Sequence, residues 1–480
     1  MLTWLSLAIA APSARPLPCV TMELLPSAPP VRTGPVLAAS GAKSNRDVWG
    51  VPHQRQSKNF VIRWGDARSV SSSAVDNLLD AFELAWSVQL DDMGHAHPYG
   101  TDGFRFNIYI GDTGDGTPPG YGSGGYYWVD DDGWPMIVVS AATLADPVYS
   151  EHTAIHEFYH ATQGATDRYA YDGISAWYWE ATAEWAALQT QPDNASNGTF
   201  VYGYVLLPAL PVNFFDYPDT GALQEYHQYG AFLFPYDLTD QVGWELVRDS
   251  WNDRGTEPDP MEVLRADLAD MGEDLDEMWL DHVGHLATMD VPDGELFQQH
   301  IDTYAGLWDE KTISDSVEGT GGEGQARGKN APGRYGAVIV RLKRPDAGTL
   351  TATVSGDPEG TEGHTGRYGA RVVHVKSGGK TTYTPLTFVD AEGSAEVEGI
   401  EEGDDVFLAI GAWSRNSEAW DSETFPLSWS LTVAEPTVKV PGSKVPTDPE
   451  VWTCDNAAAP ASGLVWLVAP LLLARRRRSS

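Results

Sequence analysis

Apolar and polar positions in the first half of the chain follow two periods, one typical of strands and one typical of helices. Apolar or alternating runs at residues 59–64, 104–110 and 135–140 predict strands. Residues 73–90 instead predict a helix with one apolar face, made by Val75, Leu78, Leu79, Phe82 and Trp86. We therefore expect an α+β domain over residues 46–312, with a mixed sheet first and a helical subdomain after it.

The second half of the chain changes to short apolar runs separated by turns rich in Gly, Asp and Pro. These runs predict strands at 336–343, 349–354, 370–375, 381–389, 405–412 and 427–433. Their regular spacing favours an antiparallel β-sandwich over residues 334–434. Residues 313–333 are rich in Gly, Ser and Glu and predict a linker. The sandwich carries no catalytic residue pattern, so we expect a binding or stabilising accessory module.

Both ends of the chain predict segments outside the folded domains. Residues 1–11 form an apolar run that ends in small residues, as a signal peptide does, and residues 12–45 predict a disordered leader. Residues 435–453 are Pro-rich and predict an extended linker. Residues 454–480 contain Cys454, an apolar segment from 457 to 474 and four Arg. Such a segment can span a membrane and leave the domains outside.

Composition narrows the classes of partner. The formal net charge of −37 over 480 residues argues against nucleic acid, because a phosphate backbone would be repelled. The only two cysteines, Cys19 and Cys454, both lie outside the predicted folded domains. A structural disulfide is therefore not expected, and the domains must be held by their cores.

The chemistry of the chain is concentrated at residues 153–163, which contain His156, Glu157 and His160 in the spacing H-E-x-x-H. No Gly or Pro interrupts residues 148–163, and Pro147 suits the first turn of a helix. Residues four apart share one helix face, so the two imidazoles can hold one Zn²⁺. Glu157 would then act as the general base on a zinc-activated water.

A catalytic zinc needs a third protein ligand and an open fourth position. A His-ended extension of the motif is excluded, because Gln163 and Thr166 stand at the required positions. Asp167 would serve if the helix continued past Gly164. We favour Glu180, which lies in an Ala- and aromatic-rich stretch where an unpaired carboxylate is costly. Glu184, one turn further on, is placed to support a ligand from behind.

This pairing of motifs resembles the gluzincins, the zinc metallopeptidases that include thermolysin and the aminopeptidase N group. The resemblance implies a zincin-like catalytic domain in which Glu180 binds zinc and Glu184 supports His156. Residues 45–310 and the chain ends are also similar to exported metalloproteases of myxobacteria-like bacteria. In that resemblance the C-terminal segment is a sorting tail, and Cys454 is where it is cut or lipidated.

Two further elements are expected to border the cleft. By resemblance, the strand at 135–140 is the sheet edge that pairs with the substrate backbone, although it could equally be an ordinary buried strand. Residues 226–238 are similar to the helix that closes the far wall. A hydrogen-bond donor there would stabilise the developing oxyanion. The candidates are Tyr226, His227 and Tyr229; we favour Tyr229, although helix packing would also explain aromatic residues there.

Other polar residues have a weaker claim to a site. Acidic side chains that could bind Ca²⁺ occur at Asp112, Asp115, Asp130, Asp131 and Asp132, but they lack EF-hand spacing and solvated turns explain them better. Four histidines lack a matching ligand set and are expected at the surface, namely His95, His97, His282 and His285.

Two functions follow from these observations. The first is an exported, zinc-dependent endopeptidase with a polypeptide substrate, located at the cell surface through its C-terminal segment or released. The second is a surface binding or adhesion protein whose zincin domain is structural or inactive. The intact base Glu157 favours the first. The absence of a G-x-M-E-N motif from residues 46–156 favours an endopeptidase over an aminopeptidase.

Overall fold

The fold is known from a computed structural model that describes residues 19, 21, 28–33, 43–122, 124–216, 223–253, 255–308, 310–420 and 422–434. The expected signal peptide, the Pro-rich linker and the segment with Cys454 and the Arg cluster lie outside these residues. Among the described residues, no helix combines the length and the apolar character needed to cross a membrane.

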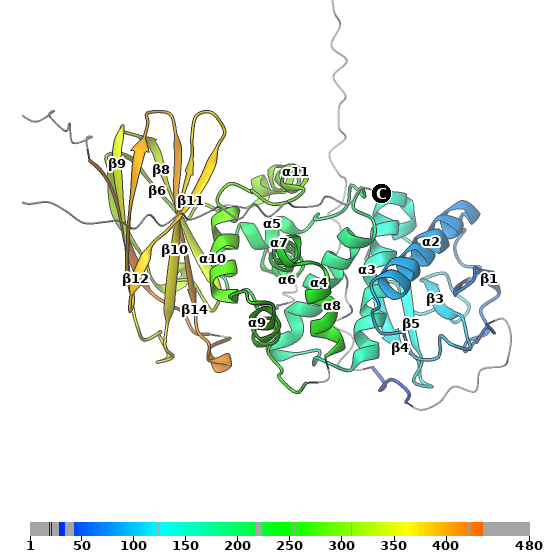
Figure 1. The fold of residues 1–480 in the computed structure, drawn as a ribbon. Coiled ribbons are helices and arrows are strands. Elements are labelled where there is room, and N and C mark those ends of the chain that lie inside the picture. The colour runs from blue at the N-terminus through cyan, green and yellow to red at the C-terminus, as the bar shows by residue number, and fades with distance from the viewer. Residues whose placement is uncertain are drawn as a thin grey trace, which may run out of the picture. The chain divides into compact units, whose positions relative to one another are not determined.

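A five-stranded mixed sheet opens the described body (Figure 1). Its strands are β1 (His53–Gln56), β2 (Phe60–Trp64), β3 (Phe106–Gly111), β4 (Gly125–Val129) and β5 (Pro135–Ser140). Their order is β1-β2-β3-β5-β4; the pairs β2–β3 and β3–β5 are parallel, and the other two are antiparallel. The expectation that residues 135–140 form the sheet edge is therefore wrong. Strand β5 lies between two neighbours, and β4 is the edge.

Strand β4 has no counterpart among the strands predicted from the sequence, because it directly follows a Gly-rich stretch. Its residues Gly125 to Val129 are nearly all buried, so they show no alternation of polar and apolar positions. A tight turn held by Asp130 joins β4 to β5: the Asp130 side chain accepts hydrogen bonds from the backbone N–H groups of Asp132 and Trp134. This hairpin puts β4 outside β5.

Two helices pack on the sheet. Helix α2 (Ser72–Ala85) runs into a π-helical turn, η2 (Trp86–Asp92), and packs against α3 (Pro147–Thr166). The apolar face predicted for residues 73–90 is confirmed, since all five of its residues are buried. Aromatic rings join the layers: the centroid of Phe60 on β2 lies 5.3 Å from Phe82 on α2 and 5.2 Å from Phe158 on α3. This packing fixes α3 against the sheet.

A helical region follows. Its helices are α4 (Ala176–Thr190), α5 (Val201–Val205), α6 (His227–Gly230), α7 (Leu233–Val242), α8 (Glu245–Asn252), α9 (Pro260–Met271), α10 (Leu275–Leu286) and α11 (Gly294–Tyr304). Fourteen residues of α4 are buried, so this helix is central. The single helix expected at residues 226–238 is divided between a 3₁₀ turn, α6 and α7. Gly230 allows the close approach there, because a Cβ would lie 2.7 Å from the Phe200 carbonyl oxygen.

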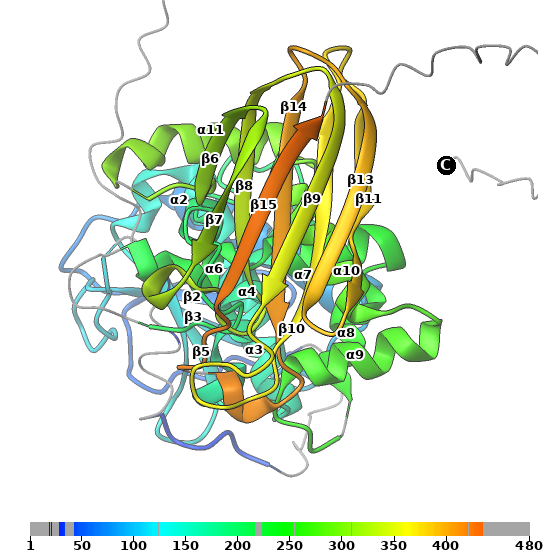
Figure 2. The same cartoon turned by 90° about the vertical axis from the view of Figure 1, so that its left-hand side faces the viewer.

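The C-terminal part is a sandwich of two five-stranded sheets, shown face on in Figure 2. Its strands are β6 (Asp315–Gly319), β7 (Gly321–Ala326), β8 (Gly336–Pro345), β9 (Gly348–Gly356), β10 (Arg367–Val375), β11 (Thr381–Pro385), β12 (Thr387–Val389), β13 (Glu392–Ile400), β14 (Asp405–Trp413) and β15 (Leu427–Ala434). One sheet has the order β11-β10-β14-β8-β6 and the other β12-β13-β9-β15-β7. The expected antiparallel pairing holds except between β6 and β8, which are parallel.

The prediction of a linker at residues 313–333 is wrong, because β6 and β7 form there. Strand β6 is the edge of the first sheet, and β7 is the edge of the second. The Gly residues of β7 serve close packing. At Gly324 a Cβ would lie 2.4 Å from the Trp429 ring, and at Gly321 it would lie 2.0 Å from the Leu431 carbonyl oxygen. Composition alone cannot separate this use of Gly from a flexible linker.

Helix α10 is the element of the helical region that packs on the sandwich. It packs on β10 and β14, and a Cβ at Gly369 would overlap the Leu280 side chain at 2.2 Å. Beside this contact the Arg371 guanidinium donates to Asp281 at 2.8 Å and to Glu277 at 2.6 Å. The sandwich is thus packed against the helical region through apolar and charged contacts.

Candidate metal centre

Helix α3 supplies two of the predicted metal ligands. Asp146 caps its N-terminus by accepting hydrogen bonds from two backbone N–H groups, and Pro147 follows as the first helical residue. The helix runs through Gly164, where a Cβ would lie 2.6 Å from the Tyr127 hydroxyl oxygen. Gly164 does not interrupt the helix, but the helix ends at Thr166 and does not continue to Asp167. Asp167 has a left-handed backbone (φ 51°) and is in neither metal-ligand cluster of the described residues.

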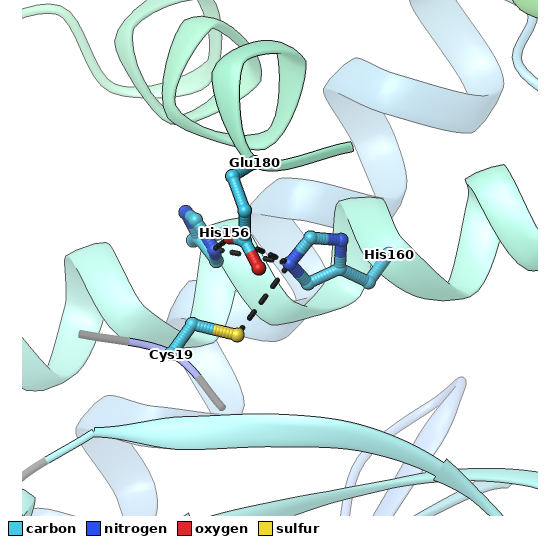
Figure 3. Close-up of side chains that lie close together, drawn as sticks. All are labelled: Cys19, His156, His160 and Glu180. Atoms are coloured by element: carbon cyan, nitrogen blue, oxygen red, sulfur yellow. Dashed lines mark hydrogen bonds and ion pairs between the residues drawn. The ribbon is translucent and has the colours of Figure 1, made fainter. Parts of the chain in front are cut away.

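Helix α4 packs on α3 and brings Glu180 to the two histidines (Figure 3). The Nε2 atoms of His156 and His160 lie 3.1 Å apart. Glu180 Oε2 lies 3.2 Å from His156 Nε2 and 3.4 Å from His160 Nε2. All three residues are at most 3 % exposed. The structure thus brings together the three residues predicted to bind the metal. Of the two candidates for the third ligand, Glu180 lies beside the histidines and Asp167 does not.

A fourth donor comes from a part of the chain that the sequence analysis placed outside the fold. Cys19 is buried, and its Sγ lies 3.6 Å from His160 Nε2 (Figure 3). The expectation that residue 19 belongs to a disordered leader is wrong, and the fourth position expected to be open faces this sulfur. No spacing rule links residue 19 to residue 156, so the sequence carried no signal for this contact.

The spacing of the donors on His156, His160 and Glu180 fits zinc, and so does the separation of Cys19 Sγ from His160 Nε2. Tetrahedral coordination with metal–nitrogen or metal–oxygen bonds of about 2.0–2.1 Å places the ligand atoms about 3.3–3.4 Å apart. The three separations among His156, His160 and Glu180 are 3.1, 3.2 and 3.4 Å. A metal–sulfur bond of about 2.3 Å gives a sulfur–nitrogen separation of about 3.6 Å, which is the distance from Cys19 Sγ to His160 Nε2. Imidazole, carboxylate and thiolate are also the ligands that zinc prefers.

A second layer of polar residues holds His156 from behind. Glu184 Oε1 lies 3.0 Å from His156 Nδ1 and 3.3 Å from His152 Nε2. His152 Nδ1 in turn lies 3.2 Å from Asn197 Oδ1. A carboxylate on Nδ1 fixes the tautomer that leaves Nε2 free to bind metal. Glu184 therefore stands where the sequence analysis expected it, while His152 and Asn197 were missed, although His152 is one turn before His156 on α3.

Charges in this buried cluster shift several pKa values. Burial alone would lower the pKa of His156, but the neighbouring carboxylates of Glu180 and Glu184 outweigh it and raise that pKa to about 10. Burial works against ionised Glu184, yet His152 and His156 lower its pKa to about 2. Burial raises the pKa of the Cys19 thiol, and the charges of Glu157 and Glu180 raise it further. The buried carboxylates are thus stable in their ionised form only beside a positive charge. Protonated histidines can provide that charge, and so can a bound metal ion.

Glu157, the predicted base, lies beside the cluster and close to strand β4. Its Oε2 accepts a hydrogen bond from the Thr21 hydroxyl at 3.1 Å, and its buried Oε1 has no hydrogen-bond partner among the described residues. A Cβ on Gly125 of β4 would lie 2.9 Å from Glu157 Cγ, so this side chain fits only because residue 125 is Gly. Burial raises the pKa of Glu157, which suits a proton acceptor.

Of the three aromatic candidates on the far wall, Tyr229 reaches the site. Its hydroxyl donates a hydrogen bond to the backbone carbonyl of Cys19 at 2.5 Å, and its ring centroid lies 6.3 Å from that of His156. Tyr226 stacks on Phe200. His227 is buried against the rings of Tyr204 and Phe214.

Other expectations about polar residues hold only in part. His95 and His282 are buried rather than at the surface, His285 is partly buried, and His97 is exposed. His282 and His285 both lie on Asp237, with Nδ1–Oδ2 distances of 3.0 and 2.8 Å. The acidic residues weighed for calcium are in neither metal-ligand cluster of the described residues. Asp130 instead pairs with Arg46 at 3.1 Å.

The comparisons with known proteins place the chain in a family without assigning its chemistry. A family model described as "Family of unknown function (DUF6055)" matches residues 31–424. The chain belongs to DUF6055. The matched range contains His156, Glu157, His160 and Glu180 but not Cys19. A search of the curated proteins finds no match to this chain.

Proposed function

We propose that this DUF6055 protein is a zinc-dependent endopeptidase with a gluzincin-type site on a zincin-like domain. The observation that carries the proposal is the near-tetrahedral spacing of the donors on His156, His160 and Glu180, with the carboxylate of Glu157 beside them. When bound, zinc would supply Lewis-acid activation of water and of a peptide carbonyl.

The residues of the chain divide the remaining work. Glu157 is the proton acceptor, because its Oε1 is buried and free of hydrogen bonds among the described residues. Tyr229 is the donor to the carbonyl oxygen, since its hydroxyl already donates to a peptide carbonyl in the site. Glu184 holds the tautomer of His156.

Strand β4 supports a polypeptide substrate over a small molecule. It is an edge strand of the sheet and lies next to Glu157. The backbone N–H of Tyr127 points off this edge and donates to the Thr21 hydroxyl oxygen at 2.8 Å. An extended peptide can take this hydrogen bond and lie along β4 with one carbonyl near Tyr229.

The test compares zinc content and peptide-library hydrolysis of the full chain with those of Glu157→Gln. The amide keeps the size of the side chain but cannot take a proton. We expect the variant to retain zinc and to lose about 10²- to 10⁴-fold in hydrolysis. Asp167→Asn is the matched control and should change neither quantity. Each variant is also made with Cys19→Ser, because Cys19 occupies the site. Two results would favour the surface binding or adhesion protein instead. One is zinc binding with equal hydrolysis by the wild type and Glu157→Gln, and the other is zinc binding with no hydrolysis by any variant.

The location of the protein is a separate proposal. We infer from residues 1–11 and 454–480 that the chain is exported and held at the membrane by its C-terminal segment, from which it can be released. Deleting residues 454–480 should release folded protein to the medium. Cell-associated or unfolded protein after that deletion would contradict the proposal that the C-terminal segment is a membrane anchor.

A further inference from the structure

We infer that Cys19 is the fourth ligand of the metal and that residues 19 and 21 hold the site in a closed, latent state. The inference rests on the proposed metal site and adds its regulation. The first support is the position of Cys19 Sγ, 3.6 Å from His160 Nε2 and in one cluster with His156, His160 and Glu180 (Figure 3). That separation is the one expected for two neighbouring ligands of a tetrahedral zinc, one sulfur and one nitrogen.

The second support is that residues 19 and 21 form hydrogen bonds with the other groups assigned to the proposed reaction, which are the base, the edge strand and the carbonyl donor. The Thr21 hydroxyl donates to Glu157 Oε2 at 3.1 Å, while its oxygen accepts from the Tyr127 N–H at 2.8 Å. The Cys19 carbonyl accepts from the Tyr229 hydroxyl. The base, the sheet edge and the carbonyl donor are therefore all engaged at once. A peptide substrate would need the same contacts.

The third support is space. The cavity between Cys19, Gly125, His156 and Glu157 has a volume of about 10 Å³, which is room for one water at most. Glu157, His160 and Glu180 are fully buried. A peptide cannot reach the metal position while residues 19 and 21 stay in place.

Opening the site is a ligand exchange without a change of redox state. The thiol of Cys19 gives its proton to solvent when the sulfur binds the metal as thiolate. On opening, the sulfur leaves and takes a proton from solvent, and a water fills its place. The same movement frees Glu157, Tyr229 and the Tyr127 N–H.

The decisive experiment uses the full chain loaded with Co²⁺ and measures the near-ultraviolet absorption band of cobalt–thiolate bonding. The two cysteines provide a matched pair of variants. We expect the band in the wild type and in Cys454→Ser, and its loss in Cys19→Ser with the metal stoichiometry unchanged. Thermal melts confirm that both variants are folded. A band that survives Cys19→Ser, or that is lost in Cys454→Ser alone, overturns the inference.

Hydrolysis separates this inference from the proposed function. Cys19→Ser should raise peptide hydrolysis by about 100-fold, because an intramolecular ligand competes at high effective concentration. Thr21→Val, which keeps the thiolate but removes both hydroxyl contacts, should give a smaller rise. Equal hydrolysis by wild type and Cys19→Ser, lost in Glu157→Gln, would overturn latency and keep the peptidase. No hydrolysis by any variant, with the cobalt band behaving as expected, would overturn the peptidase and keep Cys19 as a ligand.

Discussion

Replacing Glu184 by Gln tests how much of the metal affinity is set by a residue that does not bind the metal. Glu184 Oε1 lies 3.0 Å from His156 Nδ1. Adding the width of the imidazole and a metal–nitrogen bond of about 2.0 Å puts the carboxylate roughly 6 to 7 Å from the metal. Two unit charges at that distance interact by about 2.5 kcal/mol at an effective dielectric constant of about 20.

The size of the effect depends on the ligand in the fourth position. Zinc bound by two neutral histidines and Glu180 keeps a net charge of about +1, so losing the Glu184 charge should weaken binding about 70-fold. This agrees with the 10- to 100-fold effects typical of residues behind the ligands, at roughly 1.4–2.8 kcal/mol. The thiolate of Cys19 would cancel that charge. We therefore expect the loss to be smaller in the wild type than in Cys19→Ser.

The assay is a competition titration of zinc against a chromophoric chelator near neutral pH, with the Glu184→Gln change in both backgrounds. Glu151→Gln is the control, because Glu151 is on α3, the helix of His156, but accepts a hydrogen bond from Gln191 instead of contacting the site. Zinc affinity unchanged by Glu184→Gln, or equal losses for Glu184→Gln and Glu151→Gln, would refute the electrostatic argument.

Three further predictions follow from the packing. Gly125→Ala should reduce hydrolysis in the Cys19→Ser background with zinc retained, because a Cβ would lie 2.9 Å from Glu157 Cγ; unchanged rates would contradict this. Asp237→Asn should lower the free energy of unfolding by about 3 kcal/mol, measured by urea denaturation, because buried His282 and partly buried His285 lose their carboxylate; a loss below about 0.5 kcal/mol would refute it. Although burial opposes it, Asp237 raises the pKa of His285 above its ordinary value of 6.5. This contribution to stability is complete below pH 6.5 and is lost as pH rises through the raised pKa, so His285→Gln should flatten that decline. An unchanged slope would contradict this.

The sequence by itself determined the elements whose cause is local. The H-E-x-x-H spacing, the capped start at Pro147 and the apolar periods placed α2, α3, β2, β3 and β5 close to their observed bounds. Glu180 and Glu184 could be singled out because carboxylates in an Ala- and aromatic-rich helix need a partner. The six runs predicted for the sandwich also match strands, since their turns and alternation are local signals, but the run at 381–389 is divided between β11 and β12, and β13 was missed.

Only the tertiary structure decided what depends on contacts distant in sequence. Strand order made β4 the edge instead of β5, and the close packing of Gly324 under Trp429 turned an expected linker into a strand. Cys19 joined the site across 141 positions of sequence. Such contacts leave no period and no spacing in the chain, because what selects them is the fit of one buried surface to another.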